Sequence, residues 1–193
     1  MKRLEERLIC FLETNKAISE EDREIYAYAL KSAGILGVNI MTSLLIGFWL
    51  KVPWYCLLLL AAIILLRSDA GGYHAQTAGR CYILSCMVLM AALLWIKAEI
   101  PFRTVMTVCA AVPFFLLIFR NAPLDSENKP LNAEEKKRIG KRARVIVTME
   151  MVIGLACIPI NEKAACILLS AIISCGAGYL GWFIKNRAKQ TGM

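Results

Sequence analysis

The strongest constraint on this chain is that its apolar residues come in six separate blocks. The blocks are Ser32–Leu50, Val52–Leu66, Cys81–Ile96, Ile100–Phe119, Val145–Ile160 and Ala164–Ile184. A helix needs about 20 apolar residues to cross the hydrocarbon core of a bilayer. The hydrophobic content of 58% also exceeds that of an ordinary soluble domain. We therefore predict an all-α integral membrane protein with six transmembrane helices, forming a single membrane domain over residues 1–193.

Positive charge is divided unevenly between the segments that six spans would leave outside the bilayer. If the N-terminus lies in the cytoplasm, all but four of the 23 basic residues fall on the cytoplasmic side. The four exceptions are Lys51, Lys97, Arg103 and Lys163. Because Lys and Arg accumulate in short cytoplasmic loops, this pattern predicts that both termini are cytoplasmic. The net charge of +8 is then a topology signal, and we expect no nucleic-acid partner.

Two polar segments lie on the predicted cytoplasmic side. Residues 1–19 place Leu4, Leu8 and Leu12 at helical spacing among charged residues, which predicts an amphipathic leader lying in the membrane interface. In the basic loop 120–144, Asn132 with Glu135 predicts a helix start leading into the fifth span. The exposed basic candidates that follow are Lys136, Lys137, Arg138, Lys141 and Arg142. They could bind an acidic substrate, but anionic lipid headgroups would satisfy the same charges, so both interpretations stay open.

The only histidine of the chain lies in the polar gap SDAGGYHAQTAGRC, Ser68 to Cys81. A cysteine attacks as the thiolate, and an imidazole base is a common way to form one. If the third span begins at Cys81, the dipole of that helix favours a negative sulfur, with Arg67 and Arg80 nearby. Free N–H groups in the first turn could also hold an oxyanion. These features make His74 and Cys81 a candidate catalytic pair.

The spacing of this pair predicts a bend in the chain. Residues seven apart on a straight helix are separated by about 10.5 Å along its axis. A direct contact between thiol and imidazole needs about 3 Å. We therefore expect the chain to bend between His74 and Cys81 at Gly79, with Gly71 and Gly72 giving similar freedom earlier. A broken helix or a re-entrant segment is predicted around residues 68–81.

Several residues also have a purely structural explanation. A lone histidine can cap a helix, and a cysteine in an apolar span usually packs as a small hydrophobe. Glu150, six residues into the fifth span, is a candidate substrate contact, yet it could snorkel or pair with a basic neighbour. Gly176 to Gly181 spells GxGxxG, which inside an apolar span indicates helix packing instead of a nucleotide site. One histidine with two cysteines supplies too few ligands for zinc, so we expect no metal and no cofactor.

The stretch RSDAGGYH, Arg67 to His74, followed by Cys81, resembles the signature of the accessory gene regulator B (AgrB) family. These are bacterial membrane peptidases that mature quorum-sensing peptides. Ala122-Pro123 and Glu127 to Pro130 are similar to the family's APxxxENKP pattern. The resemblance covers nearly the whole chain and implies that His74 and Cys81 are the catalytic pair. It fixes no third catalytic residue, and the supporting candidates are Arg67, Ser68, Asp69, Gly71, Gly72, Gln76 and Arg80.

The resemblance implies a cysteine endopeptidase of the bacterial plasma membrane with its active site on the cytoplasmic side. It would cleave the acidic tail from a short amphipathic propeptide through a Cys81 acyl-enzyme, and the peptide would then close into a cyclic thiolactone or lactone. The alternative is a non-enzymatic peptide exporter subunit, which Glu150 and the small residues Ser170, Ser174 and Gly178 would also suit. A passive scaffold is a weaker alternative. The same small residues permit a homodimer and do not establish one.

Overall fold

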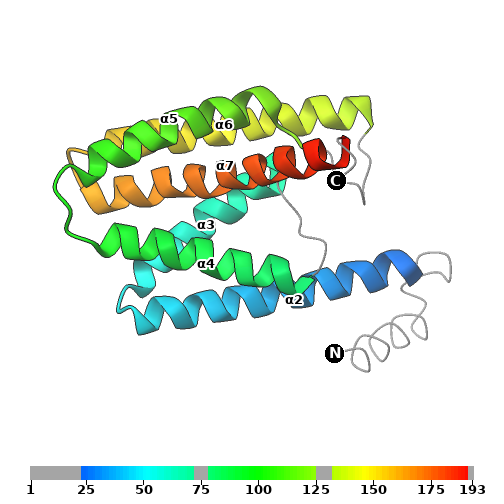
Figure 1. Ribbon diagram of the computed structural model, residues 1–193, viewed down its shortest axis with the longest axis horizontal. Coiled ribbons are helices and arrows are strands. Elements are labelled where there is room, and N and C mark those ends of the chain that lie inside the picture. The colour runs from blue at the N-terminus through cyan, green and yellow to red at the C-terminus, as the bar shows by residue number, and fades with distance from the viewer. Residues whose placement is uncertain (1–22, 72–77, 125–131, 191–193) are drawn as a thin grey trace. The chain divides into compact units, whose positions relative to one another are not determined.

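The described part of this computed structural model is entirely helical (Figure 1). The structure describes residues 23–71, 78–124 and 132–190. Its helices are α2 (Arg23–Trp49), α3 (Pro53–Ala70), α4 (Ala78–Lys97), α5 (Arg103–Asn121), α6 (Ala133–Cys157) and α7 (Glu162–Gln190). The predicted all-α fold is thus confirmed for these residues. The predicted leader at residues 1–19 lies outside them.

Local signals in the sequence explain several helix ends. Pro53 occupies the first turn of α3, where its missing N–H costs no helical hydrogen bond. At the start of α6, the backbone N–H of Asn132 donates to Glu135 Oε2 at 3.3 Å. This contact is half of a capping box, and it confirms the predicted helix start. The α6 helix therefore begins twelve residues before the predicted span Val145–Ile160, and the basic residues from Lys136 onward lie on a helix, not in a loop.

The chain divides into two compact units, residues 1–42 and 43–193. Within the first unit, the structure describes the larger part of α2, where Leu36, Val38 and Met41 are exposed. The second unit holds residues 43–49 of α2, about two turns, and helices α3 to α7. All candidate site residues have positions within this second unit.

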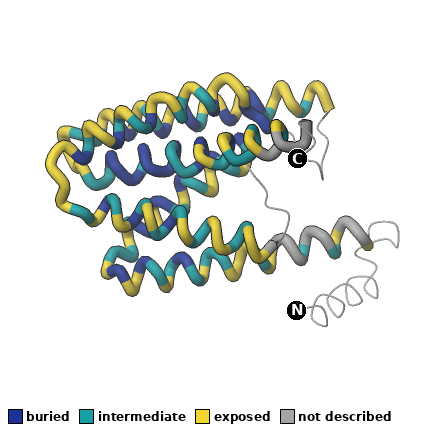
Figure 2. Tube along the Cα trace, in the orientation of Figure 1, coloured by how far each residue is buried: buried dark blue, intermediate teal, exposed yellow. Residues whose placement is uncertain are grey.

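Helix α7 is the centre of the second unit. It packs against α3, α4, α5 and α6 (Figure 1). In its apolar span 44% of the residues are buried, against 17% in the spans of α4 and α5 (Figure 2). One core cluster joins α7 to α3, α5 and α6 around Leu66, Ile118, Val147 and Tyr179. A second cluster joins α7 to α3 and α4. The arrangement makes every other helix of this unit depend on α7 for its buried face.

Glycines let α7 approach its neighbours closely. A Cβ placed on Gly176 would lie 2.6 Å from the Cβ of Phe114 on α5. On α6, a Cβ on Gly154 would lie 3.2 Å from the Leu169 side chain. Gly176 opens the GxGxxG stretch, so the structure supports its interpretation as a packing motif. Among the small residues of the predicted stripe, Ser170 is buried, whereas Ser174 and Gly178 are partly exposed.

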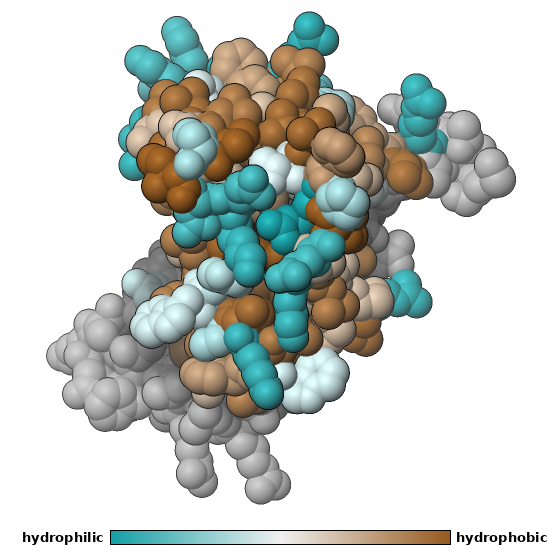
Figure 3. Space-filling view, turned by 90° about the vertical axis from the view of Figure 1, so that its left-hand side faces the viewer, coloured by the Kyte–Doolittle hydropathy of each residue, from teal (hydrophilic) through white to brown (hydrophobic). Residues whose placement is uncertain are grey.

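One end of the second unit holds the connections after α2, α4 and α6. Figure 3 views this end and shows polar side chains gathered across it, bordered by apolar ones. Here Arg103 is buried and its Nη1 donates to the carbonyl oxygens of Ile96 and Ala98 at 2.9 and 2.6 Å. Lys97 Nζ donates to Leu50 O at 3.1 Å. These cations satisfy carbonyls at helix ends, which otherwise lack intrahelical donors.

Among the described residues, four helices are long and apolar enough to cross a membrane, judged by length and composition. They are Pro53–Ala70, Gly79–Lys97, Arg103–Asn121 and Glu162–Ile184. Ala33–Trp49 of α2 is apolar but shorter. The first half of α6 is basic, which lowers the mean hydropathy of the helix although its second half is apolar. The prediction of six spans with both termini in the cytoplasm stays a prediction.

Candidate active site

The sequence motif that carries the candidate site begins at the C-terminal end of α3. Arg67, Ser68 and Asp69 lie in its last turn, so α3 continues four residues beyond the predicted span end at Leu66. The Ser68 hydroxyl donates back to Leu65 O at 2.9 Å, while Asp69 is partly exposed. Gly71 then leaves the helical conformation with a φ of 74°, a value that favours glycine. This residue ends α3, and the predicted break in the helix is present here.

Cys81 occupies the first turn of the next helix. It is the fourth residue of α4, because that helix begins at Ala78 and not at Cys81. The first four N–H groups of a helix lack intrahelical acceptors, so a group held beside this turn meets free donors. The Cys81 side chain is partly exposed, whereas Cys56, Cys166 and Cys175 are buried. All seven cysteines in the described ranges are free thiols.

The prediction that the chain bends at Gly79 is wrong. Gly79 lies inside α4, and nothing would lie within 4 Å of a Cβ added there. Ala78, Gly79 and Arg80 form the start of α4 in front of Cys81. Within the described residues, the departure from helical geometry is at Gly71; the rest of the predicted bend between His74 and Cys81 falls on residues 72–77, outside the described part of the chain, and stays a prediction. His74, Gly72 and Gln76 lie outside the described residues, so their predicted roles stay predictions.

The structure brings the two motif segments of the sequence together. The backbone N–H of Leu124, just after Ala122-Pro123, donates to Ala70 O at 3.1 Å. A Cβ on Gly71 would lie 3.0 Å from Leu124 O, so only glycine fits there without displacing the segment. The stretch that ends α3 and the stretch that follows α5 thus form one packed corner at the end of the second unit. Nothing in the sequence spacing alone would pair them.

The basic candidates and Glu150 occupy different surroundings on α6. Lys136, Lys137, Arg138, Lys141 and Arg142 are exposed. Glu150 is only 5% exposed, eight residues beyond Arg142, or about 12 Å along the helix. Neither carboxylate oxygen of Glu150 has a hydrogen-bond partner among the described residues. The basic residues therefore form a surface that Glu150 does not share, and a role for Glu150 in substrate binding stays a prediction.

One residue at this corner was not predicted. Tyr179 on α7 is fully buried, and its hydroxyl donates to Ala70 O at 2.6 Å. A tyrosine inside an apolar span is itself a signal, because a buried phenol needs a hydrogen-bond partner. The sequence does not reveal that partner, which is a backbone carbonyl 109 residues earlier.

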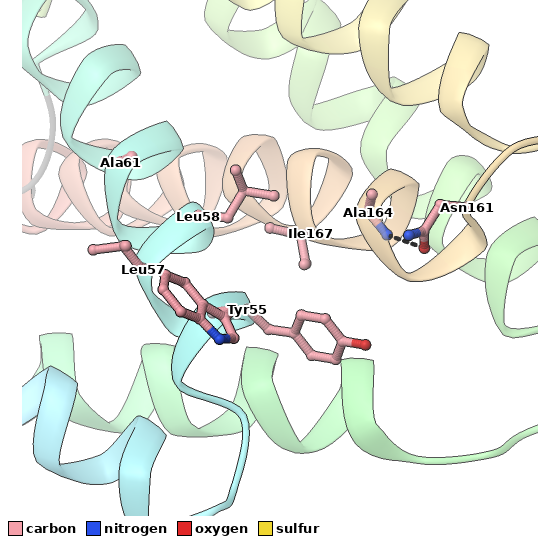
Figure 4. A pocket seen from close by; sticks show the side chains of 8 residues that line it. Tyr55, Leu57, Leu58, Ala61, Asn161, Ala164 and Ile167 are labelled. Atoms are coloured by element: carbon pink, nitrogen blue, oxygen red, sulfur yellow. Dashed lines mark hydrogen bonds between the residues drawn. The ribbon is translucent and has the colours of Figure 1, made fainter.

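A pocket of about 490 Å³ lies at the opposite end of α3 (Figure 4). Its walls come from the start of α3 and the start of α7, and they include Tyr55, Leu58, Asn161 and Ile167. The Asn161 side chain is committed to capping α7, since its Oδ1 accepts from the Ala164 N–H at 3.1 Å. None of the candidate site residues in the described part of the chain lines this pocket. Within the described ranges, no three His, Cys, Asp or Glu side chains gather as metal ligands would.

Comparison with known proteins decides the family. Residues 5–177 match the family profile described as Accessory gene regulator B. The chain belongs to the AgrB family. The match covers most of the sequence, including both motif segments and the whole of α3 to α6.

Curated relatives agree with this assignment. AgrB-like protein 2 of Clostridium perfringens (strain 13) is 26% identical over 140 residues, which are 69% of this chain and 65% of the relative. An AgrB-like protein of Clostridium acetobutylicum is 28% identical over 164 residues, which are 83% of this chain and 77% of the relative. The chain thus spans about two thirds to three quarters of the length of these AgrB-like proteins. No solved structure matches this AgrB chain significantly.

Proposed function

We propose that this AgrB-family chain is a membrane-embedded cysteine endopeptidase that matures a quorum-sensing propeptide. The observation that carries the proposal is the placement of Cys81, partly exposed in the first turn of α4, beyond a helix break at Gly71. A thiolate at this position faces the positive end of the α4 dipole. Cys56 and Cys166 also lie near the N-terminal ends of their helices, α3 and α7, but both are buried, and the Cys56 thiol donates to Ser43 O. Cys109 and Cys175 lie further along α5 and α7.

The reaction follows from these groups. His74 takes the proton from the Cys81 thiol, and the thiolate attacks the carbonyl carbon of one peptide bond at the cytoplasmic interface. The first-turn N–H groups of α4 stabilise the oxyanion that forms. His74 then protonates the departing amine, and the acidic C-terminal tail leaves. The N-terminal part of the propeptide remains on Cys81 as a thioester.

Ring closure is an exchange of one acyl bond for another. A cysteine of the bound peptide attacks the Cys81 thioester, forming a cyclic thiolactone and returning the Cys81 thiol; a serine would form a lactone. Because a thioester replaces a thioester, the step nearly conserves bond energy and needs no nucleotide. Water must be excluded while the acyl-enzyme exists, which a site between helices in the interface favours.

A covalent intermediate on Cys81 gives the direct test. We expect a tagged cognate propeptide, with its ring-closing residue replaced by Ala, to leave an adduct on the full-length protein in membranes. Intact-mass measurement would show the mass of the N-terminal fragment, and hydroxylamine would remove it because thioesters are hydroxylamine-sensitive. The adduct should be absent in Cys81→Ala and present in Cys86→Ala, which changes another partly exposed thiol of α4. Tail release without any adduct would contradict the proposal.

The exposed basic residues of α6 are proposed to hold the acidic tail. Lys137 and Lys141 are four residues apart and both exposed, so they share one face of the helix. Replacing both by Glu is expected to raise KM for the propeptide about tenfold at low salt with little change in kcat, because a binding charge is reversed. The difference should shrink at high salt. A propeptide whose tail acids are amides is the control and should show no difference between the proteins.

The outcome of that experiment also separates substrate from lipid. If the double variant loses activity equally with acidic and amidated tails, and only in membranes rich in anionic lipid, the basic face binds headgroups instead. Membrane lipids are partners of the chain in either case.

A peptide exporter without covalent chemistry is the second candidate. The observation that favours it is the carboxyl group of Glu150 on α6, which is buried and has no hydrogen-bond partner among the described residues. Ionisable residues inside membrane helices commonly mark transport routes. An exporter forms no adduct on Cys81, so the trapping experiment decides between the two functions.

A further inference from the structure

The last carbonyl oxygen of α3 is held by two donors from distant parts of the chain. Ala70 O accepts from the Tyr179 hydroxyl of α7 at 2.6 Å and from the Leu124 N–H at 3.1 Å. Carbonyls in the final turn of a helix have no intrahelical donor and are usually satisfied by water or by a capping glycine. Here the neighbouring Gly71 N–H caps Arg67 O instead. Tertiary contacts therefore fix the point where the backbone leaves α3.

Both donors are themselves held firmly. Tyr179 is fully buried in the core cluster that also contains Leu66 and Ala70, so its ring has little freedom to move. A phenol in these apolar surroundings has a strong preference for its one acceptor. The helix that carries it packs on every other helix of the second unit except the last turns of α2.

The Leu124 donor is fixed by α6. A Cβ on Gly140 would lie 2.9 Å from Cδ of Pro123, so the helix backbone lies directly against this segment. The Arg144 guanidinium donates from Nε to Phe119 O at 3.0 Å and from Nη2 to Ala122 O at 3.5 Å. The α5–α6 connection is thereby attached to α6 immediately before Leu124 donates to Ala70.

The backbone conformation of Gly71 is also fixed at the end of α3. Its φ of 74° sends the chain out of α3 in a direction that other residues rarely adopt, and Leu124 O stands 3.0 Å from where a Cβ would be. The end of α3, the α5–α6 connection and α7 thus meet at Ala70 and Gly71. Arg67, Ser68 and Asp69 precede this point within one helical turn, and His74 follows it by three residues.

We propose that Tyr179 is a positioning residue for the cysteine chemistry, acting through its hydrogen bond to Ala70 O. The inference rests on the proposed function of His74 and Cys81. Catalytic pairs tolerate little displacement, since a shift of about 1 Å costs about 100-fold in rate. The phenol does not contact the reacting atoms; it holds the end of α3 from which the chain departs toward the catalytic histidine.

The test is Tyr179→Phe, which removes one oxygen atom and keeps the ring that fills the core. In the full-length protein in membranes, we expect single-turnover tail release to fall about tenfold to 100-fold, while propeptide binding stays within about twofold. Tyr55→Phe is the matched control, because Tyr55 lies at the opposite end of α3 on the pocket wall. Its release rate should equal that of the unchanged protein. Membrane abundance and melting temperature are measured for each variant.

The outcomes separate this inference from the proposed function. If Cys81→Ala is inactive and Tyr179→Phe releases the tail at the full rate, Tyr179 has no positioning role. If binding, melting temperature and rate all fall together, the phenol is structural and the inference is wrong. If Cys81→Ala itself releases the tail normally, the cysteine chemistry fails. Should Tyr179→Phe not accumulate, Gly71→Ala disturbs the same point and must show the same loss of rate with binding preserved.

Discussion

Replacing Cys81 by Ala is expected to abolish release of the propeptide tail, and replacing His74 by Ala is expected to do the same. The loss should be on the order of 10⁴-fold or more, the scale seen when a nucleophile or its base is removed from a cysteine or serine peptidase. The physical reason is that the thiol alone is a weak nucleophile and water alone a poor base. Tail release by gel mobility, in cells expressing the protein with its tagged propeptide, is the measurement.

Cys86→Ala provides the matched control for this prediction. Cys86 is also a partly exposed thiol of α4, but it lies five residues further along the helix and away from the first turn. The Cys86→Ala variant should process the propeptide at the normal rate, provided that all variants reach the membrane in equal amounts. Equal processing by all three variants would make the histidine structural and favour the exporter.

Gly176→Ala is expected to be the most destabilising small substitution in the described helices. Its new Cβ would lie 2.6 Å from the Phe114 Cβ, so α5 and α7 must separate along their contact. Overpacking of this kind costs about 1–3 kcal/mol of unfolding free energy, more than the helix propensity gained from alanine. For a chain of 193 residues this corresponds to a fall in melting temperature of about 3–10 °C. Thermal unfolding in detergent measures it.

Gly37→Ala is the control because nothing lies within 4 Å of a Cβ added to Gly37 on α2. That variant gains helix propensity without a steric cost, so its melting temperature should be unchanged or slightly higher. If the Gly176→Ala and Gly37→Ala proteins have the same melting temperature, α5 and α7 do not pack as closely as the structure shows.

The helices were predictable because apolar blocks and capping signals are local. The Asn132–Glu135 pair indicated the start of α6 correctly, since a capping box depends on four consecutive residues. The apolar block Val145–Ile160 marks only the second half of this helix, because Lys136 and its neighbours are good helix formers that add no hydrophobicity. Local propensity and membrane hydropathy measure different things, and α6 combines a polar half with an apolar half.

The candidate site was predictable only in part. The position of Cys81 in a first helical turn follows from the boundary between polar and apolar residues, which sequence shows directly. Gly79, which the sequence offered as a flexible point, is helical, whereas α3 ends at Gly71 against Leu124. The sequence does not show this contact, because it depends on how the α5–α6 connection packs. Tyr179 could not be paired with Ala70 from the sequence, since their contact depends on how α7 packs across α3.

The central place of α7 has a consequence for biosynthesis. This helix is translated after α3, α4, α5 and α6, yet it packs against the buried faces of all four and supplies the phenol that meets Ala70. Both His74 and Cys81 are translated about 100 residues earlier. A nascent chain that contains His74 and Cys81 but not α7 therefore lacks the hydrogen bond from Tyr179 that holds the end of α3. Under the proposed function, a chain that stops before α7 is expected to be inactive although it contains His74 and Cys81.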